Sequence, residues 1–455
     1  MTHKLLVANR GEIAVRIIRA CQELGIRTVA IYSVADENSL HVKMADEAIC
    51  IGSSLSGDSY LNLNRVVSAA VATGASIVHP GYGFLAENPR FAHMLEKCDI
   101  TFVGPKADTL AFVGDKIAAK NWVKGLRIPV VDGSDGPIDH AASGIEIARK
   151  IGYPVLLKAV DGGGGKGIAV AESDAELISA FSRMQLEAKA SFGTDSLYLE
   201  TYIPRARHVE VQVMCDHSGN IVHFTERDCS MQRHNQKVIE ESPSPVMNPL
   251  LRRNLALAAV RICRSLNYRG AGTIEFLLDQ EQKYFFLEMN ARIQVEHPVT
   301  EMATGVDLVK EQILIALGEA LSIKQYQIKT KGHTIECRVN AEDVFHDFMP
   351  CPGTIHNVVM PGGPGVRIDS HIFNGYVVPS FYDSLLAKLI VHAPTRLEAI
   401  RKMRVALAGF IIDGIKTNID FLYVMMHNPT FIKGQYDTTF VMKAIREELD
   451  GELYR

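Results

Sequence analysis

Two glutamates occupy similar positions in a pair of short apolar segments. Glu275 lies within Thr273–Leu278, and Glu288 lies within Tyr284–Met289 after a polar turn. This pattern predicts two antiparallel strands whose glutamates project side by side among large apolar neighbours. Because an unpaired carboxylate is costly in such surroundings, we expect the pair to hold a divalent cation such as magnesium or manganese, with Asn290 as a third oxygen ligand. A buried salt bridge is the alternative.

Three polar residues follow at alternate positions: Arg292, Gln294 and Glu296. Alternation along an extended strand would place all three on one side. A guanidinium can grip a small planar oxyanion at two points, and a neighbouring carboxylate can take a proton from it. The three residues therefore predict a site that holds and deprotonates bicarbonate. An ordinary exposed strand shows the same alternation and is the alternative.

A glycine tract, 162–165, lies between two apolar segments, Val155–Val160 and Ile168–Ala171. Four glycines expose backbone N–H groups that can close over phosphate oxygens, and Lys158 in the first segment lies within reach of the same phosphates. The tract is not a P-loop, because glycine rather than Ser or Thr follows Lys166. We predict a hairpin that closes over a nucleotide, and a flexible surface hairpin is the alternative.

The elements that must position these residues begin with an alternation of strands and helices. Leu5–Ala8, Ile13–Leu24 and Thr28–Tyr32 are typical of strand, amphipathic helix and strand, and Ala75–His79 and Ile100–Val103 are typical of further buried strands. We therefore expect an open, largely parallel α/β layer over about the first 110 residues. The turn after its first strand lacks the G-x-G-x-x-G of dinucleotide-binding folds, which disfavours a nicotinamide dehydrogenase.

The remainder of the chain predicts an α+β region. Arg207–Met214 alternates as a strand does, and a last segment opens at His333–Val344 and ends in helices near Leu397–Leu407 and Val441–Glu448. A length of 455 residues suggests two to four domains.

Composition excludes several functional classes. With 47% hydrophobic and 22% charged residues the chain is typical of a soluble globular protein. A net charge of −4 gives no reason to expect a nucleic-acid or membrane partner. The apolar segment Leu5–Ala8 is too short for a signal peptide, and eight scattered cysteines are typical of reduced thiols, so we expect a cytoplasmic protein.

Six segments, taken in order along nearly the whole chain, resemble the biotin carboxylase family of ATP-grasp enzymes. They are Asn9–Glu12, His79–Leu85, the glycine tract, Glu226–Arg233, Arg292–Glu301 and Glu336–Asp343. The resemblance implies an N-terminal open parallel α/β (pre-ATP-grasp) domain over 1–113, an ATP-grasp domain over 114–330 with a lid at about 131–203, and a C-terminal biotin carboxylase domain over 331–445.

The resemblance also implies a role for each matching residue. ATP would be bound by Lys116, Lys158, Gly162, Gly163, Gly164, Gly165, Glu200, Ile203, His208, Gln232 and Leu277. Glu275, Glu288 and Asn290 would bind the metal, and Lys237 would hold the transferring phosphate. Arg292, Gln294 and Val295 would bind bicarbonate, with Glu296 as base, and Tyr82, Gly83, Gln294 and Arg338 would contact biotin. Two positions of the nucleotide pocket depart from the bacterial pattern: Thr201 stands where a lysine often follows the hinge glutamate, and Asn235 stands where a histidine often precedes Gln236-Lys237.

The implied activity is an ATP-dependent ligase reaction in which bicarbonate carboxylates biotin through carboxyphosphate. The chain has no Met-Lys-Met of a biotinyl domain, so biotin would arrive on a separate carrier protein. This arrangement resembles the biotin carboxylase subunit of bacterial acetyl-CoA carboxylase, a homodimer that works with a biotin carboxyl carrier protein and carboxyltransferase subunits in malonyl-CoA formation for fatty-acid synthesis. A subunit of a pyruvate or other acyl-CoA carboxylase, another ATP-grasp ligase and a non-catalytic nucleotide-binding regulator are the alternatives.

Overall fold

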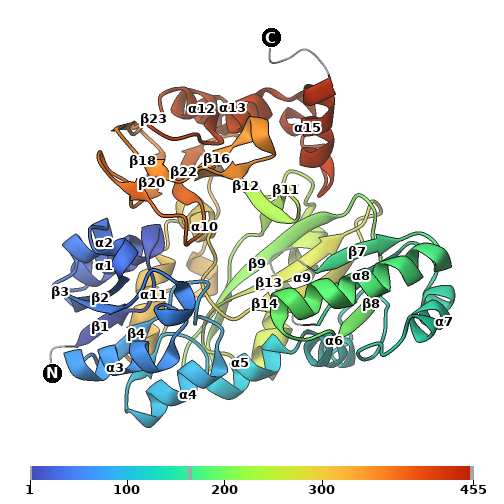
Figure 1. Cartoon of the computed structure of the whole chain (residues 1–455), viewed down its shortest axis with the longest axis horizontal. Coiled ribbons are helices and arrows are strands. Elements are labelled where there is room, and N and C mark those ends of the chain that lie inside the picture. Colours follow the sequence, from blue (N-terminus) through green and yellow to red (C-terminus); the bar gives the residue numbers. More distant parts are fainter. Residues whose placement is uncertain (1–2, 161, 163–166, 451–455) are drawn as a thin grey trace.

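The computed structural model describes residues 3–160, 162 and 167–450, whose strands form three main sheets and three two-stranded ones. The first main sheet is parallel, in the order β3-β2-β1-β4-β5. Its strands and its first helix are β1 (Lys4–Val7), α1 (Gly11–Glu23), β2 (Arg27–Ser33), β3 (Glu47–Gly52), β4 (Ile77–His79) and β5 (Thr101–Phe102). The expected α/β layer is therefore confirmed. It lies at the left of Figure 1.

The second main sheet is antiparallel and forms the centre of the molecule, in the order β14-β13-β9-β11-β12-β15-β22-β20 with β10 beside β9. Its strands are β9 (Arg207–Cys215), β10 (Ile221–His223), β11 (Arg227–Arg233), β12 (Gln236–Ser242), β13 (Gly270–Leu278), β14 (Tyr284–Asn290), β15 (His333–Asn340), β20 (Val366–Ser370) and β22 (Leu385–Ala393). The α+β expectation is confirmed. Because β12 pairs with β15, the sheet runs unbroken across residue 330.

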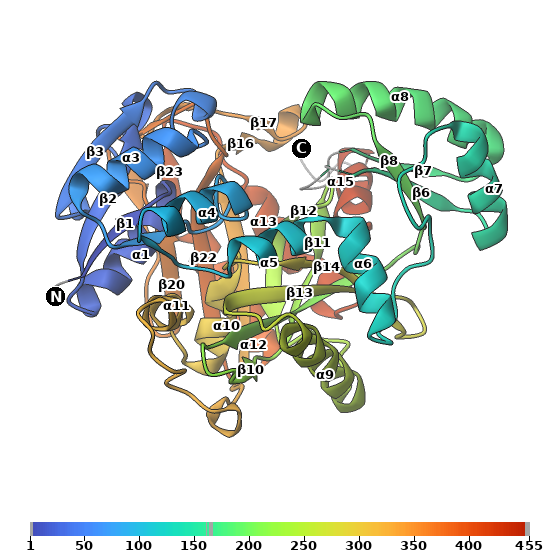
Figure 2. The same cartoon turned by 90° about the horizontal axis from the view of Figure 1, so that it is seen from below.

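The third main sheet belongs to a small unit, residues 141–201, which stands to one side of the large sheet (Figures 1 and 2). Its elements are α7 (Ala141–Ile151), β6 (Val155–Ala159), β7 (Ile168–Ala171), α8 (Asp174–Phe192) and β8 (Leu197–Thr201), and they share their own apolar core. Strands β6 and β7 are antiparallel, as the predicted hairpin requires. Gly163, Gly164 and Gly165 lie outside the described residues.

Helices cover the sheets and connect the units. In both views α4, α5 and α6 lead from the parallel layer toward the small unit. The remaining helices are α2 (Leu40–Met44), α3 (Leu63–Thr73), α4 (Pro89–Lys97), α5 (Ala107–Gly114), α6 (Lys116–Gly125), α9 (Pro249–Ser265), α10 (His297–Thr304), α11 (Leu308–Ala316), α12 (Arg396–Ala408), α13 (Ile419–His427), α14 (Pro429–Ile432) and α15 (Phe440–Asp450). None of the helices in the described ranges is both long enough and apolar enough to cross a membrane.

Short strands complete the C-terminal part of the chain. They are β16 (Glu342–Asp343), β17 (Met349–Pro350), β18 (Gly353–Thr354), β19 (Asn357–Val359), β21 (Val377–Val378) and β23 (Ile411–Asp413). They pair as β16 with β17, β18 with β21 and β19 with β23. One large apolar core joins this part to the central sheet, because side chains of β15 and β22 pack against α12 and α13.

Candidate active site

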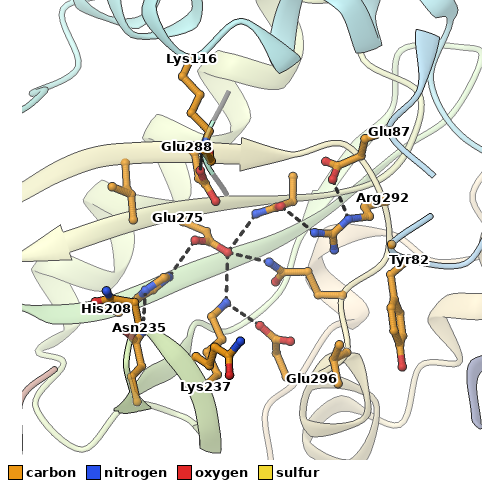
Figure 3. A pocket seen from close by; sticks show the side chains of 18 of the residues that line it. Tyr82, Glu87, Lys116, His208, Asn235, Lys237, Glu275, Glu288, Arg292 and Glu296 are labelled. Carbon is orange, nitrogen blue, oxygen red and sulfur yellow. Dashed lines mark hydrogen bonds and ion pairs between the residues drawn. The ribbon is translucent and has the colours of Figure 1, made fainter. Parts of the chain in front are cut away.

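A cleft of about 1260 Å³ lies where the parallel layer, the small unit and the central sheet meet. Tyr82 comes from the parallel layer, Lys158 from the small unit and Arg338 from the central sheet, although they are far apart in sequence. All of the predicted site residues that the structure describes line this cleft. Figure 3 shows how their side chains converge.

Glu275 and Glu288 are directly paired across β13 and β14, as the sequence predicted. Glu275 is buried, but the Glu288 side chain is 34% exposed, so the expectation that both are enclosed by apolar side chains is wrong for Glu288. The reason is that β14 is an edge strand of the sheet. Glu288 lies 3.5 Å from Lys116 across the cleft.

The Glu275 carboxylate is already neutralised by neighbours. It lies 3.1 Å from Lys237 Nζ and 2.9 Å from His208 Nε2, and it accepts a hydrogen bond of 2.9 Å from Asn290 Nδ2. Burial works to raise the pKa of Glu275, but Lys237 and His208 outweigh it and hold that pKa well below its usual value. Glu275 therefore takes part in the buried salt bridge that was the alternative to a metal site. The oxygen donors of Glu275, Glu288 and Asn290 still suit magnesium, which needs few protein ligands.

Glu296 sits between two cations at the floor of the cleft. Its Oε1 lies 2.6 Å from Lys237 Nζ, and its Oε2 lies 2.9 Å from Arg338. Burial tends to raise the pKa of Glu296, but Lys237, Arg338 and Arg227 outweigh it and hold that pKa well below the usual value. Glu296 is therefore an ionised carboxylate enclosed by positive charge.

The segment that carries Arg292, Gln294 and Glu296 is not the strand that its alternation predicts. It bends out of β14, and Glu296 is the residue before helix α10. Pro298 lies in the first turn of that helix, where a fixed φ and a missing N–H favour a helix start. The three side chains nevertheless face the cleft together, with Gln294 and Glu296 buried.

Partners that the sequence did not predict hold the bicarbonate-site candidates in place. Arg292 Nε donates to Glu87 Oε2 over 2.8 Å (Figure 3). The Gln294 amide is held from both ends: its Oε1 accepts from Arg227 over 2.8 Å, and its Nε2 donates to Glu275 over 2.6 Å. Arg227 is fully buried. Its place in Glu226–Arg233, a motif in which only Gln232 had been given a role, was the only signal that could have found it.

On the nucleotide side, Glu200 of β8 lies between two lysines. Lys158 Nζ is 2.5 Å from Glu200, and Lys120 Nζ is 2.8 Å from it. Burial favours a higher pKa for Glu200, but the two lysines prevail and lower it to about 2. Lys120 was not among the residues predicted from the sequence. Its spacing of four residues from Lys116 was an available signal, because it places both lysines on one face of α6. Lys116 Nζ donates to the carbonyl oxygen of Gly162.

The remaining nucleotide candidates and both unusual residues lie along the same wall. Gln232 Nε2 is 3.0 Å from His208 Nδ1, and the cleft wall includes Ile203, Leu277, Thr201 and Asn235. Asn235 has a φ of 61° and follows His234 with a φ of 47°. Asparagine tolerates this left-handed turn between β11 and β12.

At the opposite end, Tyr82 and Arg338 face the cleft. The Tyr82 hydroxyl donates to Glu12 Oε1, and Gly83 has a φ of 67°, which glycine adopts readily. Arg338 lies 2.6 Å from Glu240, which is fully buried. Its charge therefore has a carboxylate on both sides, Glu240 and Glu296.

Comparisons with known proteins agree with this geometry. Family models for the biotin carboxylase N-terminal domain, the carbamoyl-phosphate synthase L chain ATP binding domain and the biotin carboxylase C-terminal domain match residues 1–110, 115–324 and 336–443. Biotin carboxylase 1 of Bacillus subtilis is 52% identical over 442 residues, which cover 97% of this chain and 98% of that protein.

Solved structures are equally similar. A biotin carboxylase from Campylobacter jejuni superposes with a TM-score of 0.94 at 44% identity, covering 97% of this chain and 98% of that one. The biotin carboxylase domain of 2-oxoglutarate carboxylase from Hydrogenobacter thermophilus, a dimer with magnesium ADP and bicarbonate, superposes with a TM-score of 0.95 at 47% identity, with the same coverage. Fold and site thus define an ATP-dependent ligase of the ATP-grasp class. The chain belongs to the biotin carboxylase family.

Proposed function

We propose that this cleft carboxylates biotin with ATP and bicarbonate, and that Glu296 is the base that starts the reaction. The observation that carries the proposal is the position of Glu296 between Lys237 on the nucleotide side and Arg338 on the biotin side. The H. thermophilus relative, whose structure contains magnesium ADP and bicarbonate, supports the same substrates here.

The two cations explain how Glu296 becomes a useful base. A carboxylate held by Lys237 and Arg338 binds protons poorly, and its pKa is accordingly low. The γ-phosphate of ATP would attract Lys237, and the ureido oxygen of biotin would attract Arg338. Each substrate would therefore withdraw positive charge from Glu296 and raise its pKa toward a value at which it accepts a proton.

The proposed reaction has two stages. Glu296 takes the proton of bicarbonate, and a bicarbonate oxygen attacks the γ-phosphorus of ATP as ADP leaves, which forms carboxyphosphate. Carboxyphosphate then separates into carbon dioxide and phosphate in a site closed to water. The phosphate takes the proton of the ureido nitrogen, Arg338 stabilises the negative oxygen that develops, and the nitrogen attacks carbon dioxide.

The other residues that line the cleft take the supporting roles. We assign ATP binding to Lys116, Lys158, Glu200, Ile203, His208, Gln232, Leu277 and the glycine tract, and bicarbonate binding to Arg292, Gln294 and Val295. Glu275, Glu288 and Asn290 would hold magnesium, which neutralises phosphate charge when it is bound. Tyr82 and Gly83 would contact biotin. The lid is proposed at about residues 131–203, within an ATP-grasp domain over 114–330.

The source of biotin and the final acceptor are also part of the proposal. We propose that biotin is delivered on a separate carrier protein; the Met-Lys pair Met442-Lys443 lies in helix α15 and is therefore a poor candidate for a biotin attachment site. We propose acetyl-CoA as the final acceptor, with carboxyltransferase subunits as partners, a cytoplasmic location where ATP is made, and a homodimer like the H. thermophilus domain. Reconstitution with a bacterial carrier and carboxyltransferase, with malonyl-CoA as readout, tests the acceptor against pyruvate.

The direct test of the reaction uses free biotin. Purified protein with ATP, magnesium and labelled bicarbonate is expected to release ADP, to release it faster when free biotin is added, and to form carboxybiotin only when bicarbonate and biotin are both present. Release of ADP with amine acceptors but no carboxybiotin would point instead to another ATP-grasp ligase. Absence of both products would leave a nucleotide-binding regulator.

Loss of Lys158 is expected to weaken nucleotide binding. Lys158→Ala removes one charged hydrogen-bond donor from the cleft, and such a contact contributes about 1.5–3 kcal/mol. The Kd for ATP, measured by calorimetry, should therefore rise about tenfold or more. Glu200 keeps Lys120 at 2.8 Å, so the variant should fold. Lys124→Ala, at an exposed position of α6, is the control, and an unchanged Kd in Lys158→Ala would refute the role.

A further inference from the structure

Lys388 is a fully buried lysine in the central sheet, with 0% of its side chain exposed. It lies on β22 directly opposite Arg338 of β15 and Asp369 of β20. Directly opposite residues of antiparallel strands share a face, so Lys388 projects from the same face of the sheet as the biotin-site candidate Arg338. Burying an ammonium group is costly unless acceptors surround it, which directs attention to its partners.

Its acceptors come from opposite sides of the active site. Lys388 Nζ lies 2.9 Å from the carbonyl oxygen of Val295 and 3.0 Å from Glu12 Oε1. Glu12, buried in α1, also accepts the hydroxyl hydrogen of Tyr82. Asp369, at 3.9 Å, adds a second negative charge. One ammonium group therefore ties the Gln294–Glu296 segment to the loop of Tyr82.

We propose that Lys388 is a positioning residue that fixes the biotin side and the bicarbonate side of the cleft relative to each other. The inference rests on the biotin carboxylation proposed above. Without the ammonium group, the Val295 carbonyl and the Glu12 carboxylate lose their shared donor. The peptide that presents Val295 and the ring of Tyr82 can then shift, while the nucleotide wall formed by Lys158 and Glu200 has no contact with Lys388.

The test compares the KM of each substrate in Lys388→Met, which keeps the length of the side chain but not its charge. Loss of an outer-shell residue that orients metal ligands commonly costs about 10- to 100-fold in affinity or activity, and Lys388 orients substrate-binding groups in the same indirect way. We expect the KM for free biotin and for bicarbonate each to rise about tenfold or more, with the KM for ATP within about twofold of wild type. Lys402→Met is the matched control, because Lys402 also donates to backbone carbonyls, those of Pro364 and His392, away from the cleft.

Each outcome has a distinct meaning. Unchanged KM values, or an equal rise for all three substrates, would overturn the positioning role, since a purely structural lysine affects them alike. If Lys388→Met does not fold, Glu12→Ala is the second variant: it keeps the contact with Val295 but breaks the link to Tyr82. It should raise the KM for biotin about tenfold and that for bicarbonate less than about threefold, and equal changes would overturn the inference. A wild-type protein that forms no carboxybiotin overturns the proposed function itself.

Discussion

Glu296→Gln is expected to lower biotin carboxylation about a hundred- to ten-thousandfold, the usual effect of removing a general base. Glutamine keeps the size of the side chain but cannot accept the proton of bicarbonate. Because the pKa of Glu296 lies well below its usual value in the protein without ligands, the wild-type residue is an ionised carboxylate before the substrates bind. The loss in the variant therefore reflects missing base chemistry rather than a change in charge with pH.

The measurement is the kcat for carboxybiotin formation, with the Kd for ATP determined separately. Glutamine leaves Lys237 with Glu210 at 2.7 Å and Glu275 at 3.1 Å, so the nucleotide wall should stay intact and the Kd should change little. Glu281→Gln, on the exposed turn between β13 and β14, controls for loss of a carboxylate. Turnover at the wild-type rate in Glu296→Gln would show that another group takes the proton.

Arg338→Ala should lower carboxybiotin formation about a hundred- to a thousandfold, the range for removing a donor that stabilises a developing oxyanion. The guanidinium would face the ureido oxygen of biotin, whose negative charge grows as the nitrogen loses its proton. Nucleotide contacts lie at the other end of the cleft. Bicarbonate-dependent ADP release should therefore keep its wild-type KM for ATP.

The fold should tolerate this change despite the buried partner of Arg338. Burial raises the pKa of Glu240 to about 7, although the Arg338 charge lowers it. Without Arg338 that pKa rises further, so Glu240 becomes neutral at assay pH instead of remaining a buried unpaired anion. Arg27→Ala, on an exposed strand end, is the control for stability and charge. A variant that carboxylates biotin normally would exclude Arg338 from oxyanion stabilisation.

Local patterns were enough to predict the elements that carry the chemistry. The paired segments around Glu275 and Glu288 formed the expected hairpin, because two apolar strands joined by a short polar turn have little choice of partner. The strand, helix and strand of the first layer were likewise set by periodicity that repeats within a few residues. Every site residue that the family motifs predicted, and that the structure describes, lines one cleft.

The environment of those residues depended on the tertiary structure. The alternation of Arg292, Gln294 and Glu296 correctly predicted that the three side chains lie on the same side. It wrongly predicted a strand, because the segment bends before the start of α10. Position at the sheet edge, not local sequence, left Glu288 partly exposed.

No local pattern identified the partners of the supporting residues Arg227, Glu87 and Lys388. Lys388 meets Glu12 across 376 positions of the chain, and Arg292 meets Glu87 across about 205. The sequence by itself therefore determined which side chains share one face of a regular strand or helix, because the repeat of the backbone fixes the direction of each side chain. Only the packing of the three sheets decided which charges face one another, because a buried ion pair requires partners brought together by the whole fold.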